Sequence, residues 1–314
     1  MNGPVVVSAT HANPRSMWAS LVPEDLQGAA HIVEYVAAEA LDEYETFEAT
    51  RRDAFAAAGA DEPSISTIVV DRFVDPESRW QVEITGGVLG DGFVYPPSLV
   101  GTTGDIGTQT EEVFEALGRL MGDGAHVVQT VDFTTRATLR EYKATGAVRR
   151  AHLHPPYPGA AGILMSRLRT RAAKIQLEAV ATVLPCAEVN PGWERYGKLT
   201  YRPAVRAGDV LWMAGQGALD PATEQAMYAD DLGAQTQYTY ENVCKVLEAA
   251  GAGPEHLVKL VEYVTPVAIA NYEEAVAARV KVIGDQDVPI VSVVCDTLLR
   301  REFQIEVVPL AVVR

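Results

Sequence analysis

The stretch DLGAQTQYTYENVCKVL, residues 231–247, decides the fold because the chain contains a second version of it. Residues 105–120 read DIGTQTEEVFEALGRL, and Gln109 matches Gln235. Recurrence of one pattern along a chain indicates that a supersecondary unit occurs more than once. In the later copy, apolar residues recur at helical spacing and the glycines of AAGAG follow, so the pattern predicts an amphipathic helix.

Two further segments repeat in the same order after these helices. GAHVVQTVDFTT (residues 124–135) resembles PEHLVKLVEYVT (residues 254–265), and both are typical of strands. KIQLEAVATV (residues 174–183) resembles EFQIEVVPLAV (residues 302–312). The second comparison pairs Gln176 and Glu178 with Gln304 and Glu306. Each unit therefore contains strand, helix, strand, helix and two further strands, which predicts an α+β fold with a mixed sheet and two helices on one face.

The repeats predict the domain organisation. One module is expected over residues 80–184 and a second over residues 201–314, with the turn-rich segment 185–200 as linker. Residues 1–79 form an N-terminal extension of helix and strand. Within it, AAGADEPSISTIVVDRFVDP echoes AAGAGPEHLVKLVEYVTP, so the extension is either a truncated third copy or an unrelated segment of similar composition.

Composition excludes several classes of function. The net charge of −16 disfavours nucleic acid as a partner, because an acidic surface repels phosphate backbones. No common nucleotide-binding or zinc motif occurs, so neither a cofactor nor a metal is expected. No apolar run is long enough to span a membrane, and the N-terminus lacks the pattern of a secretory signal. With only three cysteines in no recognisable motif, these features favour a cytoplasmic protein.

The motifs YRPAVRAGDVLWMAGQGALDPATEQ (residues 201–225), AQT…ENVCKVLEAAGAG and FQIEVVPLAV together resemble the RidA (YjgF/UK114) family. The resemblance covers residue 201 to the C-terminus and, through the internal repeat, residues 80–185 more weakly. It implies tandem modules with a chorismate-mutase-like fold, packed as a trimer with pockets between neighbouring modules. Typical members hydrolyse enamines and imines without cofactor, and two-module relatives include the chorismatases.

The resemblance also identifies what this chain lacks. Family members bind the substrate carboxylate with an arginine, whose position falls at Val291 in the second module and near Pro158-Gly159-Ala160 in the first. An asparagine of the second helix is replaced near Val276 and Gly146. The glutamate that positions water in the family is matched by Glu306 and by Glu178. The usual substrates, imines derived from amino acids, are therefore uncertain for both modules.

Three residues are the candidates for catalysis: Glu306, Glu178 and Cys295. A partly buried glutamate could act as general base or orient water, although the Gln-x-Glu pairs could equally lie on a solvated strand face. Cys295 could be a nucleophile, although free cysteines are often simply buried apolar residues.

The remaining candidates are expected to bind the substrate. Arg149 or Arg150 could replace the missing arginine, although both also suit the C-terminus of a helix; Arg167 and Arg279 are comparable. Trp193 and Tyr196 could stack on a substrate or anchor the linker. Gln216 and Gln304 could line the pocket through their amides.

Two functions remain open from sequence. The first is an enzyme that hydrolyses or deaminates a small enamine, imine, enol or carbonyl compound, or a related lyase. The second is a non-catalytic protein that binds or senses a small molecule. Self-association as a homotrimer is expected, with an assembly inside one chain, completed by the N-terminal region, as the alternative.

Overall fold

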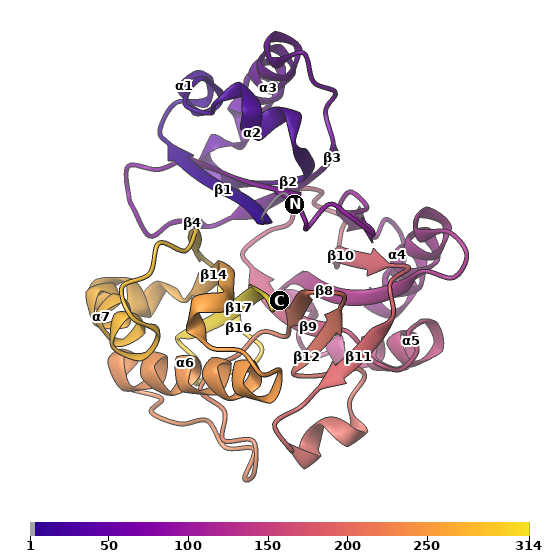
Figure 1. Ribbon diagram of the computed structural model, residues 1–314, viewed down its shortest axis with the longest axis vertical. Helices are drawn as coiled ribbons and strands as arrows, with labels where there is room; N and C mark the ends of the chain where they lie inside the picture. Colours follow the sequence, from indigo (N-terminus) through magenta and orange to yellow (C-terminus); the bar gives the residue numbers. More distant parts are fainter. Residues whose placement is uncertain (1–3, 314) are drawn as a thin grey trace.

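Three β-sheets face a common core in the computed structural model, which describes residues 4–313, and the helices lie on the outside (Figure 1). Each sheet belongs mainly to one segment of the chain. We refer to residues 4–87, 93–182 and 186–312 as units one, two and three. None of the helices in the described residues is both long and apolar enough to cross a membrane.

Unit one has a four-stranded sheet in the order β1-β5-β2-β3, in which β2 and β3 are parallel and the other pairs antiparallel. Its elements are β1 (Pro4–His11), α1 (Pro14–Ala19), α2 (Pro23–Gln27), β2 (Ala29–Ala37), the 3₁₀ helix η1 (Ala38–Glu43), α3 (Tyr44–Ala58), β3 (Ser64–Val70), β4 (Arg72–Phe73) and β5 (Trp80–Gly87).

Unit two repeats this order, with β10 and β8 in the middle, β9 parallel to β8, and β6 and β7 on the far side of β10. Its elements are β6 (Phe93–Val94), β7 (Leu99–Val100), α4 (Ile106–Met121), β8 (His126–Thr135), η2 (Arg136–Thr138), η3 (Tyr142–Ala144), α5 (Thr145–His152), β9 (Gly159–Met165) and β10 (Gln176–Thr182).

Unit three has the same central order, β13-β17-β14-β15, extended by β12 and β11. Its elements are β11 (Cys186–Val189), η4 (Glu194–Lys198), β12 (Ala204–Ala207), β13 (Val210–Met213), α6 (Leu232–Ala249), η5 (Pro254–His256), β14 (Leu257–Val264), η6 (Pro266–Asn271), α7 (Tyr272–Ile283), β15 (Ile290–Val294), β16 (Thr297–Leu298) and β17 (Ile305–Val312).

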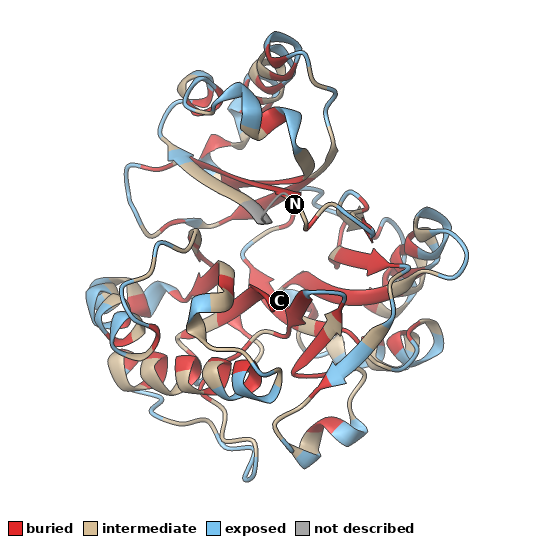
Figure 2. Ribbon diagram, in the orientation of Figure 1, coloured by how far each residue is buried: buried red, intermediate tan, exposed pale blue. Residues whose placement is uncertain are grey.

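Two short edge strands pair with the sheets of neighbouring units. β4 of unit one pairs with β15 of unit three, and β16 of unit three pairs with β9 of unit two. At the centre, the inward faces of β2, β8 and β14 supply Tyr35, Phe133 and Tyr263 to one buried core, and the rings of Phe133 and Tyr263 lie 6.0 Å apart. Figure 2 shows this buried centre surrounded by helices with exposed outer faces.

A buried triad of carboxylate, tyrosine and arginine marks the same place in every unit. The triads are Glu34–Tyr44–Arg51, Asp132–Tyr142–Arg149 and Glu262–Tyr272–Arg279. In each unit the tyrosine follows the carboxylate by 10 residues and donates a hydrogen bond to it. The arginine forms an ion pair with the same carboxylate. A carboxylate this deeply buried needs such partners, which gives the triads a structural role.

The structure confirms the predicted α+β class with mixed sheets and corrects two predicted boundaries. Strand β5 pairs with β1 and β2, so the N-terminal unit extends to Gly87 and not to residue 79. The segment predicted as a linker includes β11, which pairs with β12 at the edge of the third sheet.

Candidate functional site

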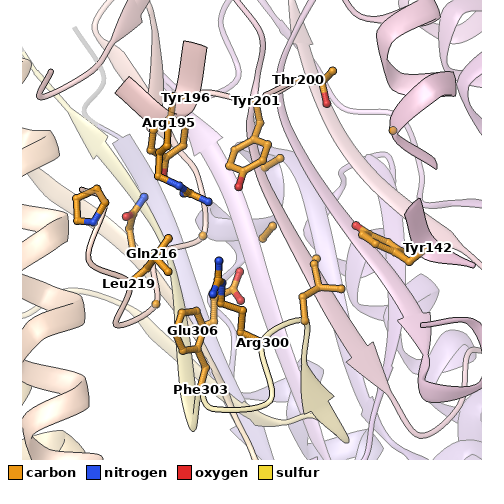
Figure 3. A pocket seen from close by; sticks show the side chains of 18 of the residues that line it. Tyr142, Arg195, Tyr196, Thr200, Tyr201, Gln216, Leu219, Arg300, Phe303 and Glu306 are labelled. Atoms are coloured by element: carbon orange, nitrogen blue, oxygen red, sulfur yellow. The ribbon is translucent and has the colours of Figure 1, made fainter. Parts of the chain in front are cut away.

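The main pocket lies between units two and three and has a volume of about 360 Å³. β9 and the segment η3–α5 form one side. The loop after β13, the loop before β17 and the helix η4 form the other. The position between two packed units and the size are both typical of small-molecule sites. Figure 3 shows its polar and aromatic side chains.

Glu306 is a carboxylate in the wall of this pocket, near the start of β17 and opposite Tyr263 of β14. It is only partly exposed to the cavity. Burial raises its pKa from 4.5 to about 8. A carboxyl group with this pKa is mostly protonated at pH 7 yet able to lose its proton, as a general acid–base group must be.

Two glycines allow this arrangement. A Cβ atom at Gly215 would clash with the carboxylate of Glu306, and it would lie 2.9 Å from the Cβ of Ala161. A Cβ atom at Gly217 would clash with the ring of Phe303. The sequence MAGQGAL therefore brings backbone, carboxylate and ring into contact because its glycines have no side chains.

Gln216, between these glycines, is fixed by its backbone. Its N–H donates to the carbonyl of Val307, and its carbonyl accepts from the N–H of Val307, both at 2.8 Å. The side-chain nitrogen donates to the carbonyl of Ala214 at 3.3 Å. Gln216 is thus buried beside β17 and lines the pocket next to Glu306.

Among the basic residues that line the pocket, Arg195 and Arg300 bring positive charge next to Glu306. The guanidinium of Arg195 lies 5.0 Å from the ring centre of Tyr196, and its buried Nε has no hydrogen-bond partner among the described residues. Its nearest carboxylate, Glu224, is 4.0 Å away. Arg300 also lines the pocket, and no ion pair between described residues involves it. Both guanidinium groups can therefore bind an anionic ligand, which a planar fork of donors holds well.

Five predicted site residues lie together in this pocket. They are Glu306, Gln216, Trp193, Tyr196 and Arg149. The rings of Trp193 and Tyr196 stack with their centres 5.9 Å apart. The charge of Arg149 is already neutralised by Asp132, so this arginine does not replace the arginine of the family as predicted.

Cys295 does not reach the pocket. It is fully buried, and its thiol donates to the carbonyl of Val264 at 3.6 Å. Burial is the main cause that raises the pKa of the thiol, and the nearby carboxylates of Glu306 and Asp71 raise it further. The thiolate needed for nucleophilic attack is thus disfavoured, and the structure favours the alternative of a buried apolar residue.

Glu178 faces a different cavity, of about 50 Å³, at the centre of the three sheets. It lies opposite Val131 of β8, while Val308 lies opposite Val261 of β14. Glu178 therefore corresponds to Val308, and the counterpart of Glu306 is Gln176, opposite Phe133. The predicted pairing was displaced by two residues, because alternating strands look alike after such a shift.

Gln304, Arg150 and Arg167 also lie outside the main pocket. The side chain of Gln304 donates to the carbonyl of Ala229 at 2.8 Å, away from the cavity. Arg150 is exposed on α5, and Arg279 is bound to Glu262 in its triad. Arg167 is partly buried but does not line the cavity.

The counterparts of Glu306 in the other units are glutamines that close the interfaces. Gln176 donates to the carbonyl of Thr67 at 2.8 Å, and Gln81 donates to the hydroxyl of Ser8 at 2.8 Å and the carbonyl of Ile290 at 3.4 Å. Of the three equivalent positions, only that of Glu306 carries an acid.

No arginine occupies the place that the resemblance assigns to the carboxylate ligand. Strand pairing makes Val291 equivalent to Ala161 and Ser66, opposite Val261, Val131 and Val33 respectively. Ala161, one residue beyond the predicted Pro158-Gly159-Ala160, lines the main pocket. The small side chain leaves room that an arginine would occupy.

Sequence analysis did not select Arg195, Arg300, Tyr142 or Tyr201, all of which line the pocket. Arg300 and Arg195 lie in loop and 3₁₀ segments outside the repeats, so no periodic pattern marks them. Tyr142 carried a detectable signal, because the acid–tyrosine–arginine spacing occurs three times in the chain.

Comparison with known proteins supports the C-terminal part of this picture. Residues 196–313 match the family model described as Endoribonuclease L-PSP. RutC family proteins of Pyrococcus horikoshii and Pyrococcus abyssi are 36% and 35% identical over 63 residues, which are 20% of this chain and 49% of each relative. The chain thus spans about half the length of the curated relatives it matches.

Solved structures are also similar to part of the chain. One is a YjgF/YER057c/UK114 family member from Mycobacterium tuberculosis, at 24% identity and a TM-score of 0.35, covering 41% of this chain and all of that one. Another is E. coli TdcF with bound serine, at 21% identity and a TM-score of 0.33, covering 36% of this chain and 88% of that one.

Proposed function

We propose that the chain is a cofactor-independent hydrolase of small anionic imines or enamines, with Glu306 as its acid–base group. The observation that carries this proposal is the position of Glu306, whose pKa is raised to about 8 inside a pocket that Arg195 and Arg300 also line. The match of residues 196–313 to the family supports the same class of reaction. Related hydrolytic or lyase steps on enol or carbonyl compounds would use the same groups.

The proposed reaction begins with substrate binding. Arg195 and Arg300 hold the carboxylate of the substrate, taking the place of the arginine absent at Ala161. Trp193, Tyr196 and Phe303 cover the apolar part of the substrate. Charge-assisted hydrogen bonds of this kind contribute about 1.5–3 kcal/mol each.

Proton transfer then follows at Glu306. The neutral carboxyl protonates the nitrogen of an imine, or the terminal carbon of an enamine, and gives an iminium ion and a carboxylate. The carboxylate takes a proton from water while the water oxygen bonds to the iminium carbon. The same proton then passes to the nitrogen of this carbinolamine. As the carbon–nitrogen bond breaks, the hydroxyl proton of the carbinolamine passes to the Glu306 carboxylate, which leaves a carbonyl compound and ammonia and restores the neutral carboxyl.

We also propose that the three units form the complete assembly within one chain. Their shared strand order, the edge strands paired between units and the three triads support a duplicated ancestry for units one, two and three. This is the alternative to the predicted homotrimer. Light scattering tests it: the proposal expects a monomer of 33.8 kDa in solution, and a stable trimer would contradict it.

The competing function is a non-catalytic binding protein. The acidic net charge makes ribonuclease activity the weaker reading of the family description. Ammonia release from freshly generated 2-iminobutyrate and 2-aminoacrylate separates hydrolase from binding protein. We expect turnover by the wild type and a loss of about 100-fold or more in Glu306→Gln. Binding of either compound without turnover would support the binding protein.

A further inference from the structure

The triad of unit two differs from its two counterparts in its acid, an aspartate in place of a glutamate, and in the residue opposite that acid on the next strand. In unit one, the Thr67 hydroxyl lies 2.8 Å from the hydroxyl of Tyr44. In unit three, the Ser292 hydroxyl lies 2.8 Å from the hydroxyl of Tyr272. Thr67 lies opposite Glu34 and Ser292 opposite Glu262, so strand pairing makes Gly162, opposite Asp132, their equivalent. Unit two therefore lacks the threonine or serine hydroxyl that lies beside the tyrosine in the other two units.

The consequence is an unfilled hydrogen-bonding position on Tyr142. Its hydroxyl donates to Oδ2 of Asp132 at 2.8 Å and accepts from Arg149 at 3.2 Å. A hydroxyl has one hydrogen and two lone pairs, so one lone pair remains. In the other units the threonine or serine side chain lies at this position.

The free side of Tyr142 faces the main pocket. Tyr142 and Gly162 both line the cavity, and a Cβ atom at Gly162 would lie 2.8 Å from the Tyr142 hydroxyl. Cδ1 of Leu299, another residue of the pocket wall, lies 2.5 Å from the same point, so an apolar group that cannot hydrogen-bond to Tyr142 stands where the other units have a hydroxyl. Figure 3 shows Tyr142 across the pocket from Gln216, with its hydroxyl end toward the cavity.

The environment fixes Tyr142 as a neutral acceptor. Burial and the nearby Glu306 raise its pKa, so it stays protonated at neutral pH, and its single hydrogen is bound to Asp132. Asp132 is fully buried, and its Oδ1 has no partner among the described residues, which strengthens its demand for that hydrogen. What remains available to a ligand is an oxygen lone pair.

We infer that Tyr142 forms a specificity subsite that accepts a hydrogen bond from a hydroxyl or amino group of the substrate. The inference rests on the proposed function in taking the main pocket as the substrate site. The substrate would be a small carboxylate held by Arg195 and Arg300, with an O–H or N–H donor at its other end. Such a molecule is larger than 2-aminoacrylate, which agrees with the pocket volume of about 360 Å³ and with the small side chains of Ala161 and Gly146 in its wall.

Isosteric probes test the subsite by titration calorimetry at pH 7. The three positional isomers of hydroxyphenylacetate are compared with the corresponding methylphenylacetates, which match them in size but carry no donor. Wild type should bind at least one hydroxy isomer about three- to tenfold more tightly than its methyl counterpart, the worth of one neutral hydrogen bond.

Matched variants locate the effect. Tyr142→Phe and Gly162→Ser should both abolish the preference for the hydroxyl, the first by removing the acceptor and the second by placing a side chain against it as Leu299 moves aside. Tyr44→Phe and Tyr272→Phe remove the equivalent hydroxyls from the other two triads and should leave the preference unchanged.

Three outcomes would overturn the inference. They are equal affinity of wild type for the two series, retention of the preference in Tyr142→Phe, and no measurable binding of any probe at millimolar concentration. Affinity needs no turnover, so the two proposals fail separately. A hydroxyl preference without ammonia release refutes the reaction, and ammonia release without the preference refutes the subsite.

Discussion

The raised pKa of Glu306 predicts a pH dependence of stability that one substitution should remove. The carboxyl has a pKa of about 8 in the folded protein and 4.5 as reference value for the unfolded chain. Between these values the folded protein holds a proton that the unfolded chain has lost. The free energy of unfolding must therefore fall as pH rises through this interval.

The size of the effect follows from the two pKa values. Each pH unit within the interval is worth 1.36 kcal/mol, which sets a maximum of about 5 kcal/mol between pH 4.5 and 8. Water in the open pocket screens the charge, so we expect about 2–5 kcal/mol. Glu306→Gln keeps the shape of the side chain and cannot ionise, so it should lose this component.

The assay is denaturant unfolding of wild type and Glu306→Gln at intervals from pH 5 to pH 9. The difference between their unfolding free energies should move in favour of the variant by about 1 kcal/mol per pH unit up to pH 8, then level off. Glu302→Gln, on an exposed side chain, is the control and should run parallel to wild type. Parallel curves for Glu306→Gln would refute a raised pKa at this site.

Three further predictions concern the pocket and its surroundings. Gly215→Ala should displace the Glu306 carboxylate, lower turnover strongly and reduce the free energy of unfolding by about 1–3 kcal/mol in denaturant unfolding. Gly118→Ala, where a Cβ meets nothing within 4 Å, should change neither turnover nor stability, and normal turnover in Gly215→Ala would contradict the contact. Arg195→Ala and Arg300→Ala should each weaken phenylacetate binding by about 10- to 100-fold in calorimetry, while Arg150→Ala on the exposed face of α5 should not. Equal affinities of the three variants would exclude a carboxylate held by these arginines. Cys295→Ala should keep the kcat/KM of the wild type in the ammonia assay despite a modest loss of stability, because the thiol is buried away from the pocket. A loss of about 100-fold in kcat/KM would indicate that Cys295 is a catalytic group.

The fold was accessible from sequence wherever a pattern repeated. The copies at residues 105–120 and 231–247 predicted α4 and α6, and those at 124–135 and 254–265 predicted β8 and β14. The boundary at residue 79 failed because the turn at Asp75-Pro76-Glu77-Ser78, directly in front of β5, was taken as the end of a unit, whereas it connects two parts of the same unit. The membership of β5 in the first sheet depends on pairing between distant segments, which sequence alone does not reveal.

The site was accessible only in part. Glu306 lies on a repeated strand whose alternation placed it near a pocket, and Gln216 was marked by the glycines of the loop after β13. The register of β10 against β8 cannot be read from the sequence, so Glu178 was matched to Glu306 although Gln176 is the structural counterpart. Arg195 and Arg300 come from irregular segments, where side-chain direction follows from tertiary packing and not from periodicity.

One of the three equivalent interfaces is open, and the proposed reaction at this interface depends on an acid. Ammonia release from 2-iminobutyrate and 2-aminoacrylate by Glu306→Gln, Gln176→Ala and Gln81→Ala tests it most directly. We predict that turnover falls by about 100-fold or more in Glu306→Gln and persists in the two glutamine variants. Turnover that survives Glu306→Gln but is lost in Gln176→Ala or Gln81→Ala would place the reaction at another interface and refute the role of Glu306.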